Sequence, residues 1–111
     1  YLDLFAGKND HEAVKRAGAG GHKEINRTNL TTEQMGEALK KPIVARQLEL
    51  LRFRSTCPAF AKESRIMINS DGNKMEFTWE NDGYQAKLMA DLKTFEFAIT
   101  ETAPDGQTRT L

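Results

Sequence analysis

The feature that most constrains the fold is a strict alternation of apolar and polar residues in the last third of the chain. Between residues 74 and 80, Met75, Phe77 and Trp79 alternate with Glu76, Thr78 and Glu80. Successive side chains of a strand point to opposite faces of its sheet, so this period of two is typical of a strand with one buried face. Turn sequences rich in Asn, Asp and Gly flank the segment at 70–73 and 81–83. The pattern predicts a strand between two tight turns.

Similar segments on either side extend this strand into a sheet. Residues 64–69 form a strand of mixed pattern, and Ala86, Leu88 and Ala90 share a face with Tyr84 on the next one. Phe95, Phe97 and Ile99 are expected to share a face on a further strand. Four strands at close spacing predict an antiparallel meander. The tail from Ala103 is expected to be a final turn or a frayed end.

The middle of the chain has the pattern of two helices. Thr31 is a candidate N-cap with Gln34 three residues later, which is a capping box. Pro42 suits the first turn of a second helix, in which Val44, Leu48 and Leu51 form an apolar stripe widened by Ile43 and Leu50. Cys57 precedes Pro58 and should end this helix, because a residue before proline avoids helical angles.

The first thirty residues differ from the rest. Asn9 or Asp10 can cap a short helix from His11 to Ala17, and the glycines at 18–21 stop it. The polar segment 22–30 has no clear period and buries little. It is expected to form loops on a scaffold outside this chain. The fold class is therefore α+β, with two or three helices followed by a small antiparallel β-sheet.

Composition excludes several classes of partner. Sixteen basic and sixteen acidic residues give no net charge, so neither nucleic acid nor a membrane is expected as partner. Cys57 is the only cysteine, which excludes an internal disulfide and favours a cytoplasmic location. The first residue is not Met, and we expect the numbering to begin inside a longer protein.

The chain lacks the patterns that catalysis or cofactor binding would require. His11-Glu12-Ala13-Val14-Lys15 begins like a zinc-protease motif, but Lys15 stands where the second histidine ligand is needed. We therefore expect no metal and no cofactor. Cys57 is expected to be an inert thiol, and the aromatic strand face to be core rather than a sugar platform. No convincing pair of carboxylates is present, so no catalytic residue is assigned.

Two motifs resemble a known family. Tyr1-Leu2-Asp3-Leu4-Phe5-Ala6-Gly7-Lys8-Asn9-Asp10 is similar to the segment beyond the eighth barrel strand of sucrose phosphorylases, and Glu24-Ile25-Asn26-Arg27 is similar to their Ile-Asn-Arg motif. Lys41-Pro42-Ile43-Val44 and the run from Leu51 to Phe60 support the match. The chain thus resembles the C-terminal end of a sucrose phosphorylase-type glucosyltransferase of the α-amylase superfamily.

The resemblance implies a division of the chain and a site residue. Residues 1–60 would be the end of the catalytic (β/α)₈ barrel, with its post-strand-8 loops and closing helices, and 61–111 a C-terminal antiparallel β domain. Arg27 would correspond to the substrate-binding arginine of the glucosyl subsite, which pairs with an aspartate from an earlier loop. The catalytic carboxylates would lie upstream of Tyr1.

The resemblance also implies the substrates of the whole enzyme, which are an α-glucoside and inorganic phosphate. Sucrose-specific members commonly continue after Ile-Asn-Arg with His and Tyr, whereas Thr28, Asn29 and Leu30 stand here. The acceptor (fructose, fructose phosphate, glycerate or glycerol) therefore stays open, as does the oligomeric state, with a homodimer allowed. Cys57 stands where the family often has His.

Two functional hypotheses follow. The first is a catalytically inactive C-terminal part of a retaining glycoside phosphorylase that transfers glucosyl between sucrose, or a related α-glucoside, and phosphate. The alternative is an independent α+β carbohydrate- or protein-binding module. The module hypothesis predicts that the first thirty residues pack against the helices with Arg27 in a closed pocket.

Overall fold

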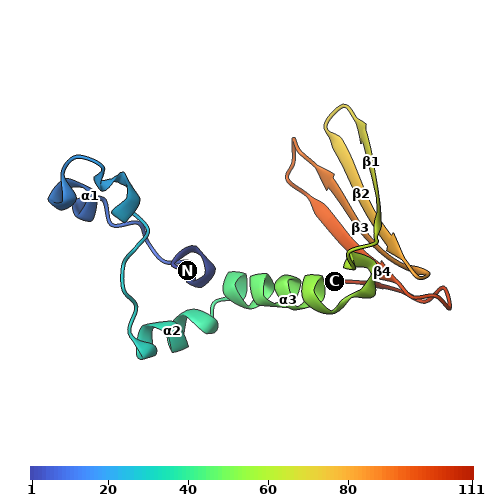
Figure 1. Cartoon of the computed structure of the whole chain (residues 1–111), viewed down its shortest axis with the longest axis horizontal. Helices are drawn as coiled ribbons and strands as arrows, with labels where there is room; N and C mark the ends of the chain where they lie inside the picture. Colours follow the sequence, from blue (N-terminus) through green and yellow to red (C-terminus); the bar gives the residue numbers. More distant parts are fainter. The chain divides into compact units, whose positions relative to one another are not determined.

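The computed structural model describes all residues from 1 to 111. The chain divides into two compact units, Tyr1–Arg52 and Phe53–Leu111. The boundary falls inside the helix α3 (Pro42–Thr56), which begins in the first unit and ends in the second (Figure 1). The assignment of residues 1–60 to a barrel end and of 61–111 to a β domain stays a prediction.

The first unit is built from short helices whose ends follow the sequence signals. It holds the 3₁₀ helices η1 (Asp3–Phe5) and η2 (Gly21–Glu24), the α-helices α1 (His11–Ala17) and α2 (Thr32–Leu39), and most of α3. Asp10, and not Asn9, caps α1 by accepting from the N–H of Ala13. Both hydrogen bonds of the predicted capping box between Thr31 and Gln34 are present at the start of α2.

Helix α3 begins at Pro42 and ends before the Cys57-Pro58 pair, as expected. The predicted apolar stripe is only partly buried. Val44 is fully buried, but Leu51 is 53% exposed and Ile43 57% exposed. The last turn instead contributes the buried Phe53 to the second unit.

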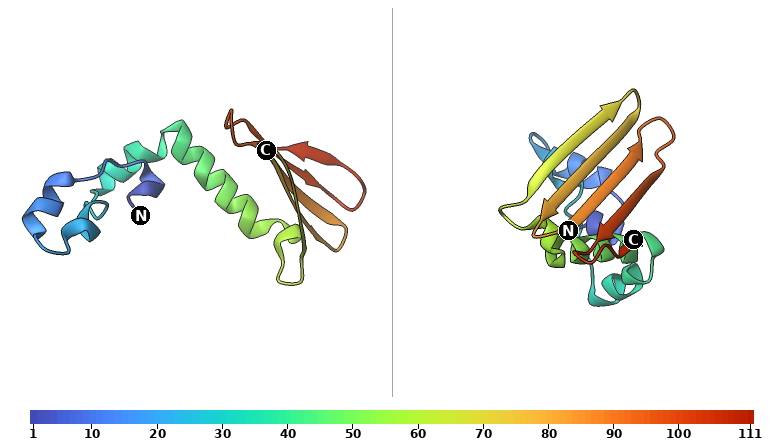
Figure 2. Two further views of the ribbon diagram at one scale, coloured as in Figure 1. Left: turned by 90° about the horizontal axis from the view of Figure 1, so that it is seen from above. Right: turned by 90° about the vertical axis from the view of Figure 1, so that its right-hand side faces the viewer.

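The second unit is a five-stranded antiparallel sheet in the order β1-β2-β3-β4-β5 (Figure 2). Its strands are β1 (Arg65–Asp71), β2 (Lys74–Asn81), β3 (Tyr84–Asp91), β4 (Phe97–Thr102) and β5 (Thr108–Thr110). Each strand pairs with the next along the chain: two-residue turns join β1 to β2 and β2 to β3, and five residues connect β3 to β4 and β4 to β5. Asp82 and Gly83, both with positive φ, form the turn between β2 and β3.

The register places the apolar residues on one face of the sheet. Trp79 pairs with Ile66 and Ala86, and Phe77 pairs with Ile68 and Leu88. One end of this face is covered by a core cluster of Phe53, Cys57, Ala59 and Ala86, against which Phe60, Trp79, Tyr84, Ile99 and Leu111 pack. Ala59 lies in the 3₁₀ helix η3 (Pro58–Phe60), which follows α3. In β2, Phe77 and Trp79 are half-buried on this face, whereas Thr78 on the opposite face is 4% exposed, so the alternation predicts the strand correctly but not which of its residues is most buried.

Two expectations for the last strands were wrong. The tail after Ala103 turns at Gly106 and returns as β5, so the sheet has five strands rather than four. Phe95 is not on the face of Phe97 and Ile99 but in the turn before β4, with φ of 62° and 80% of its surface exposed. The Oδ1 atom of Asp91 accepts from the N–H groups of Lys93 and Thr94, which bends the chain there.

The α+β fold class is confirmed, with three α-helices followed by the antiparallel sheet. No helix combines the length and apolar character needed to cross a membrane.

Candidate functional site

Arg27 lies two residues beyond η2, in the segment that leads to α2. Its backbone N–H donates to the carbonyl of Glu24 at 3.2 Å, and its Nη1 donates to Oε1 of Glu24 at 3.1 Å. The side chain of Arg27 is 62% exposed. A guanidinium has five N–H donors, so the contact with Glu24 leaves several of them to face outward.

The backbone on both sides of Arg27 is held by long-range hydrogen bonds. The N–H of Asp10 donates to the carbonyl of Ile25 at 2.8 Å. The hydroxyl of Tyr1 donates to the carbonyl of Thr28 at 2.7 Å. The three residues 25, 27 and 28 thus each make a backbone hydrogen bond, although the segment has no regular structure of its own.

Asp10 is fixed by the helix that it caps. Its Oδ1 accepts from the N–H of Ala13 at 2.9 Å, and its Oδ2 accepts from Nη2 of Arg16 at 3.0 Å. The N–H of Ala13, followed by the guanidinium of Arg16, lowers the pKa of Asp10 below its ordinary value of 3.8. The carboxylate is therefore charged at neutral pH and ties both ends of α1 together.

A glycine turn returns the chain from α1 to η2. Gly18 and Gly20 have φ of 65° and 84°, which only glycine adopts readily. Gly21 is buried, and a Cβ atom there would lie 2.4 Å from the carbonyl oxygen of Val14. The close approach of η2 to α1 thus requires glycine, and it brings Ile25 within reach of Asp10.

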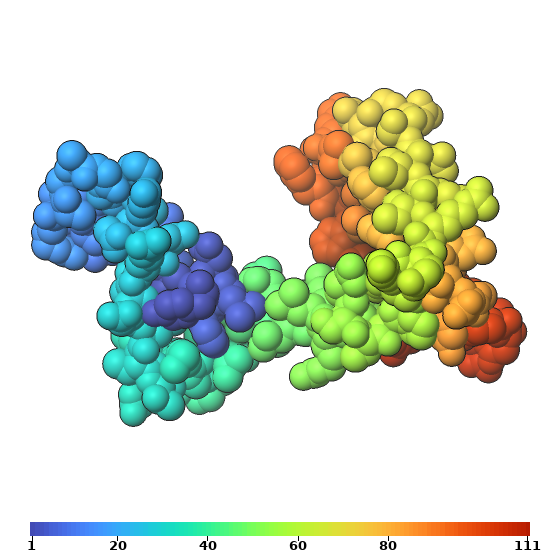
Figure 3. Space-filling view, in the orientation of Figure 1, coloured from blue at the N-terminus to red at the C-terminus, as the bar shows by residue number.

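Tyr1 is positioned by its own local contacts. Its ring meets that of Phe5 edge-on, with the centroids 6.5 Å apart. The Nζ of Lys41 donates to the carbonyls of Phe5 at 3.2 Å and Ala6 at 3.0 Å, which attaches η1 to the start of α3. In Figure 3 the dark blue atoms of the first residues lie against the teal atoms of the segment before α2.

Chemically, the Arg27 segment can present a cation on a fixed backbone. An exposed guanidinium can donate two parallel hydrogen bonds to a carboxylate, or single bonds to hydroxyl groups. Glu24 limits the directions in which the side chain points. The structure places Arg27 in the open, and not in the closed pocket that the module hypothesis predicts.

Cys57 and the aromatic residues of β2 pack in the sheet unit. Cys57 is buried in the core cluster, and burial, followed by the nearby Glu101 carboxylate, raises the pKa of its thiol. Trp79 stacks on Phe77 with centroids 5.8 Å apart and also contacts Phe60. No group of three or more His, Cys, Asp or Glu side chains gathers where a metal ion could bind.

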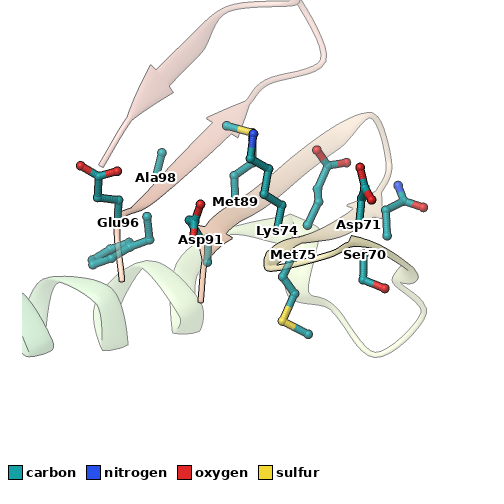
Figure 4. Close-up of a pocket in the computed structure, with 12 residues that line it drawn as sticks. Ser70, Asp71, Lys74, Met75, Met89, Asp91, Glu96 and Ala98 are labelled. Carbon is teal, nitrogen blue, oxygen red and sulfur yellow. The ribbon is translucent and has the colours of Figure 1, made fainter. Parts of the chain in front are cut away.

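A hollow of about 550 Å³ lies at the far end of the sheet, between the β1–β2 turn and the start of β4. Figure 4 shows Met75 and Ser70 pointing to one side of the sheet and Lys74 and Asp71 to the other. The lining of the hollow includes Met89 and Phe97 and lacks Arg27. The hollow is mostly apolar and offers no constellation of catalytic groups.

Sequence reasoning proposed Arg27 but missed the residues that hold its segment. The sequence indicates the capping role of Asp10 but not its backbone bond to Ile25. Nothing in the sequence indicates that the hydroxyl of Tyr1 reaches Thr28, 27 residues away. The Tyr1–Thr28 and Asp10–Ile25 pairs meet only because the glycine turn reverses the chain between them.

No protein-family model matches the sequence. The chain is 48% identical over its full length to the sucrose 6(F)-phosphate phosphorylase of Ilumatobacter coccineus, of which it covers 21%. It is 36% identical to the sucrose 6(F)-phosphate phosphorylase of Thermoanaerobacterium thermosaccharolyticum, with 96% of the chain and 21% of that protein covered. The glucosylglycerol phosphorylase of Marinobacter adhaerens is 34% identical, with 100% and 23% covered.

A solved structure has the same fold. The crystal structure of sucrose 6F-phosphate phosphorylase from Thermoanaerobacter thermosaccharolyticum superposes with a TM-score of 0.85 at 34% identity, and the match covers all of this chain and 22% of that one. The chain thus spans about a fifth of the length of the relatives that it matches.

Proposed function

We propose that this chain, which belongs to the sucrose phosphorylase family and corresponds to its C-terminal part, works within a retaining α-glucoside phosphorylase. The whole enzyme would transfer a glucosyl group reversibly between an α-glucoside and inorganic phosphate. The observation that supports this most strongly is the match of the entire chain, at 48% identity, to a protein named as a phosphorylase. The alternative of an independent binding module is not favoured, since the matched relatives are all several times longer.

In this proposal the chain contributes Arg27 to the glucosyl subsite. The exposed guanidinium would donate to sugar hydroxyls and pair with a carboxylate from another part of the enzyme. The hydrogen bonds on both sides of Arg27 support this role, because a binding residue works best on a backbone that is already ordered. Glu24 would keep the side chain from folding onto other partners before substrate binds.

The reacting carboxylates would come from outside residues 1–111. Retention of configuration needs a nucleophile and an acid/base about 5 Å apart, flanking the glycosidic bond. Isolated, this chain would be inactive. Two of the relatives are named for sucrose 6(F)-phosphate and one for glucosylglycerol, so these are the first α-glucosides to test. Thr28, Asn29 and Leu30 follow Arg27 and would lie toward the acceptor.

The test is phosphorolysis by the full-length polypeptide that contains this chain. We expect glucose 1-phosphate to form from at least one of sucrose, sucrose 6F-phosphate, glucosylglycerate and glucosylglycerol, and only when phosphate is present. The 111-residue chain alone serves as the control and should release none. If the full-length protein converts none of the four glucosides, the proposed function is wrong.

Two further properties belong to the proposal. A cytoplasmic location is supported by Cys57, which is free and is the only cysteine. A homodimer of the whole enzyme is also proposed, and apolar side chains left exposed on the sheet, such as Ile68 and Phe97, support it. A monomer at all concentrations in sedimentation would contradict the dimer.

A further inference from the structure

We infer that Tyr1 and Asp10 are positioning residues for Arg27, an inference that rests on the proposed function. Neither would touch the substrate. Each anchors the backbone of the segment that carries the guanidinium, one on either side. The hydroxyl of Tyr1 binds the carbonyl of Thr28 at 2.7 Å, and the N–H of Asp10 binds the carbonyl of Ile25 at 2.8 Å.

The segment that carries Arg27 needs such anchors because it has no regular pattern of backbone hydrogen bonds of its own. Regular structure ends with η2 at Glu24 and resumes with α2 at Thr32. Residues in such a connection keep conformational freedom that substrate binding must otherwise remove. Two bonds that bracket Arg27 within four residues restrict that freedom before substrate arrives.

The two anchors are themselves fixed. The ring of Tyr1 packs edge-on against Phe5, and Lys41 holds the carbonyls of Phe5 and Ala6. Asp10 is immobilised by its cap on Ala13 and its ion pair with Arg16. The hydroxyl that binds Thr28 thus belongs to a residue that is 62% exposed and is held by its ring contact with Phe5, whereas the N–H that binds Ile25 belongs to the N-cap of α1.

The side chain of Tyr1 is the sharper probe, because Tyr1→Phe removes one hydroxyl and keeps the ring contact with Phe5. In the full-length polypeptide we expect Tyr1→Phe to lower kcat/KM for phosphorolysis roughly 3- to 10-fold, the loss of one hydrogen bond. Tyr84→Phe, the other tyrosine of the chain, lies in the sheet unit and should leave kcat/KM unchanged.

A positioning role predicts that the effects of Tyr1→Phe and Arg27→Lys on kcat/KM are not independent. In an Arg27→Lys background, Tyr1→Phe should lower kcat/KM by less than about twofold, since the group that it positions is gone. Hydrogen exchange of peptides covering residues 25–30 should rise in Tyr1→Phe and not in Tyr84→Phe. Asp10→Ala should raise exchange in the same peptides, and Asp10→Asn less, because asparagine also caps helices.

The outcomes separate this inference from the proposed function. If Arg27→Lys is impaired but Tyr1→Phe keeps wild-type kcat/KM and exchange, or loses the same factor in both backgrounds, the inference alone is overturned. If Arg27→Lys has wild-type activity, the role of Arg27 is wrong and the inference with it. A wild-type polypeptide that performs no phosphorolysis overturns the proposed function, and with it the inference.

Discussion

The thiol of Cys57 shows how the surroundings of one residue set its chemistry. It belongs to the core cluster of the sheet unit, is 6% exposed, and lies near the carboxylate of Glu101. Burial, and then the negative charge of Glu101, disfavour the thiolate and raise the pKa of Cys57 above its ordinary value of 9.0. A thiol in this state packs as a small apolar group.

We predict that Cys57 reacts slowly with iodoacetamide. The rate in the folded protein should rise with a pH midpoint above 9.0, and unfolding in urea should bring the midpoint down to the ordinary value. Because the pKa of Cys57 is higher in the folded than in the unfolded protein, the thiol also makes stability depend on pH. Its contribution to stability is fully present below the pKa of the unfolded protein and is lost as the pH rises through the pKa of the folded protein. A midpoint below 9.0 in the folded protein would contradict the account.

At the scale of the element, α2 depends on its cap. The side chain of Thr31 accepts from the N–H of Gln34, whose Oε1 in turn accepts from the N–H of Thr31 at 2.8 Å. We expect Thr31→Ala to destabilise the first unit by about 1 kcal/mol. Thr32→Ala, one residue later inside the helix, is the matched control and should change the free energy of unfolding by less than about 0.5 kcal/mol. Equal effects in urea denaturation would contradict the capping role.

The contact of η3 with the sheet depends on aromatic packing. Phe53 and Phe60 meet edge-to-face with centroids 5.3 Å apart, and Phe60 lies 5.2 Å from Trp79. We expect Phe53→Ala to destabilise the sheet unit by about 3–5 kcal/mol, since Phe53 is buried. Phe95→Ala is the control, because Phe95 is 80% exposed. The urea midpoint should fall only in Phe53→Ala, and a larger shift in Phe95→Ala would contradict this view of the core.

Local signals predicted most elements, and their failures have physical causes. The cap at Thr31, the stop at Cys57-Pro58 and the strand over residues 74–80 depend on neighbours in sequence, and the structure confirms all three. The apolar stripe of α3 is only partly buried, since Leu51 is 53% exposed. The strand position of Phe95 was wrong because an Asp91-centred turn overrides the alternation.

The candidate site was predicted less completely than the fold. Arg27 came from a resemblance between short motifs, whereas the bonds from Tyr1 and Asp10 depend on a return of the chain that no local pattern encodes. A hydroxyl–carbonyl bond across 27 residues has no sequence signature. The bonds that hold the Arg27 segment are therefore harder to predict from sequence than the candidate residue itself.

At the scale of the whole molecule, the chain is a minor part of what its relatives contain. It matches about a fifth of their length, yet along its own length the match is complete. Each unit has its own packing, but neither gathers a set of catalytic groups. This combination is explained if the chain supports, and adds one side chain to, an active site whose reacting groups lie elsewhere in the polypeptide.

The most direct test is the kcat/KM of the full-length polypeptide for phosphorolysis, with Arg27→Ala measured beside Arg46→Ala. Both arginines pair with a glutamate three residues away, Arg27 with Glu24 and Arg46 with Glu49. If Arg27 binds the sugar, its loss should lower kcat/KM by about 100-fold or more, the cost of removing a preorganised donor from an active site. Arg46→Ala should leave kcat/KM unchanged. A full-length Arg27→Ala enzyme that works as well as the wild type would contradict the account.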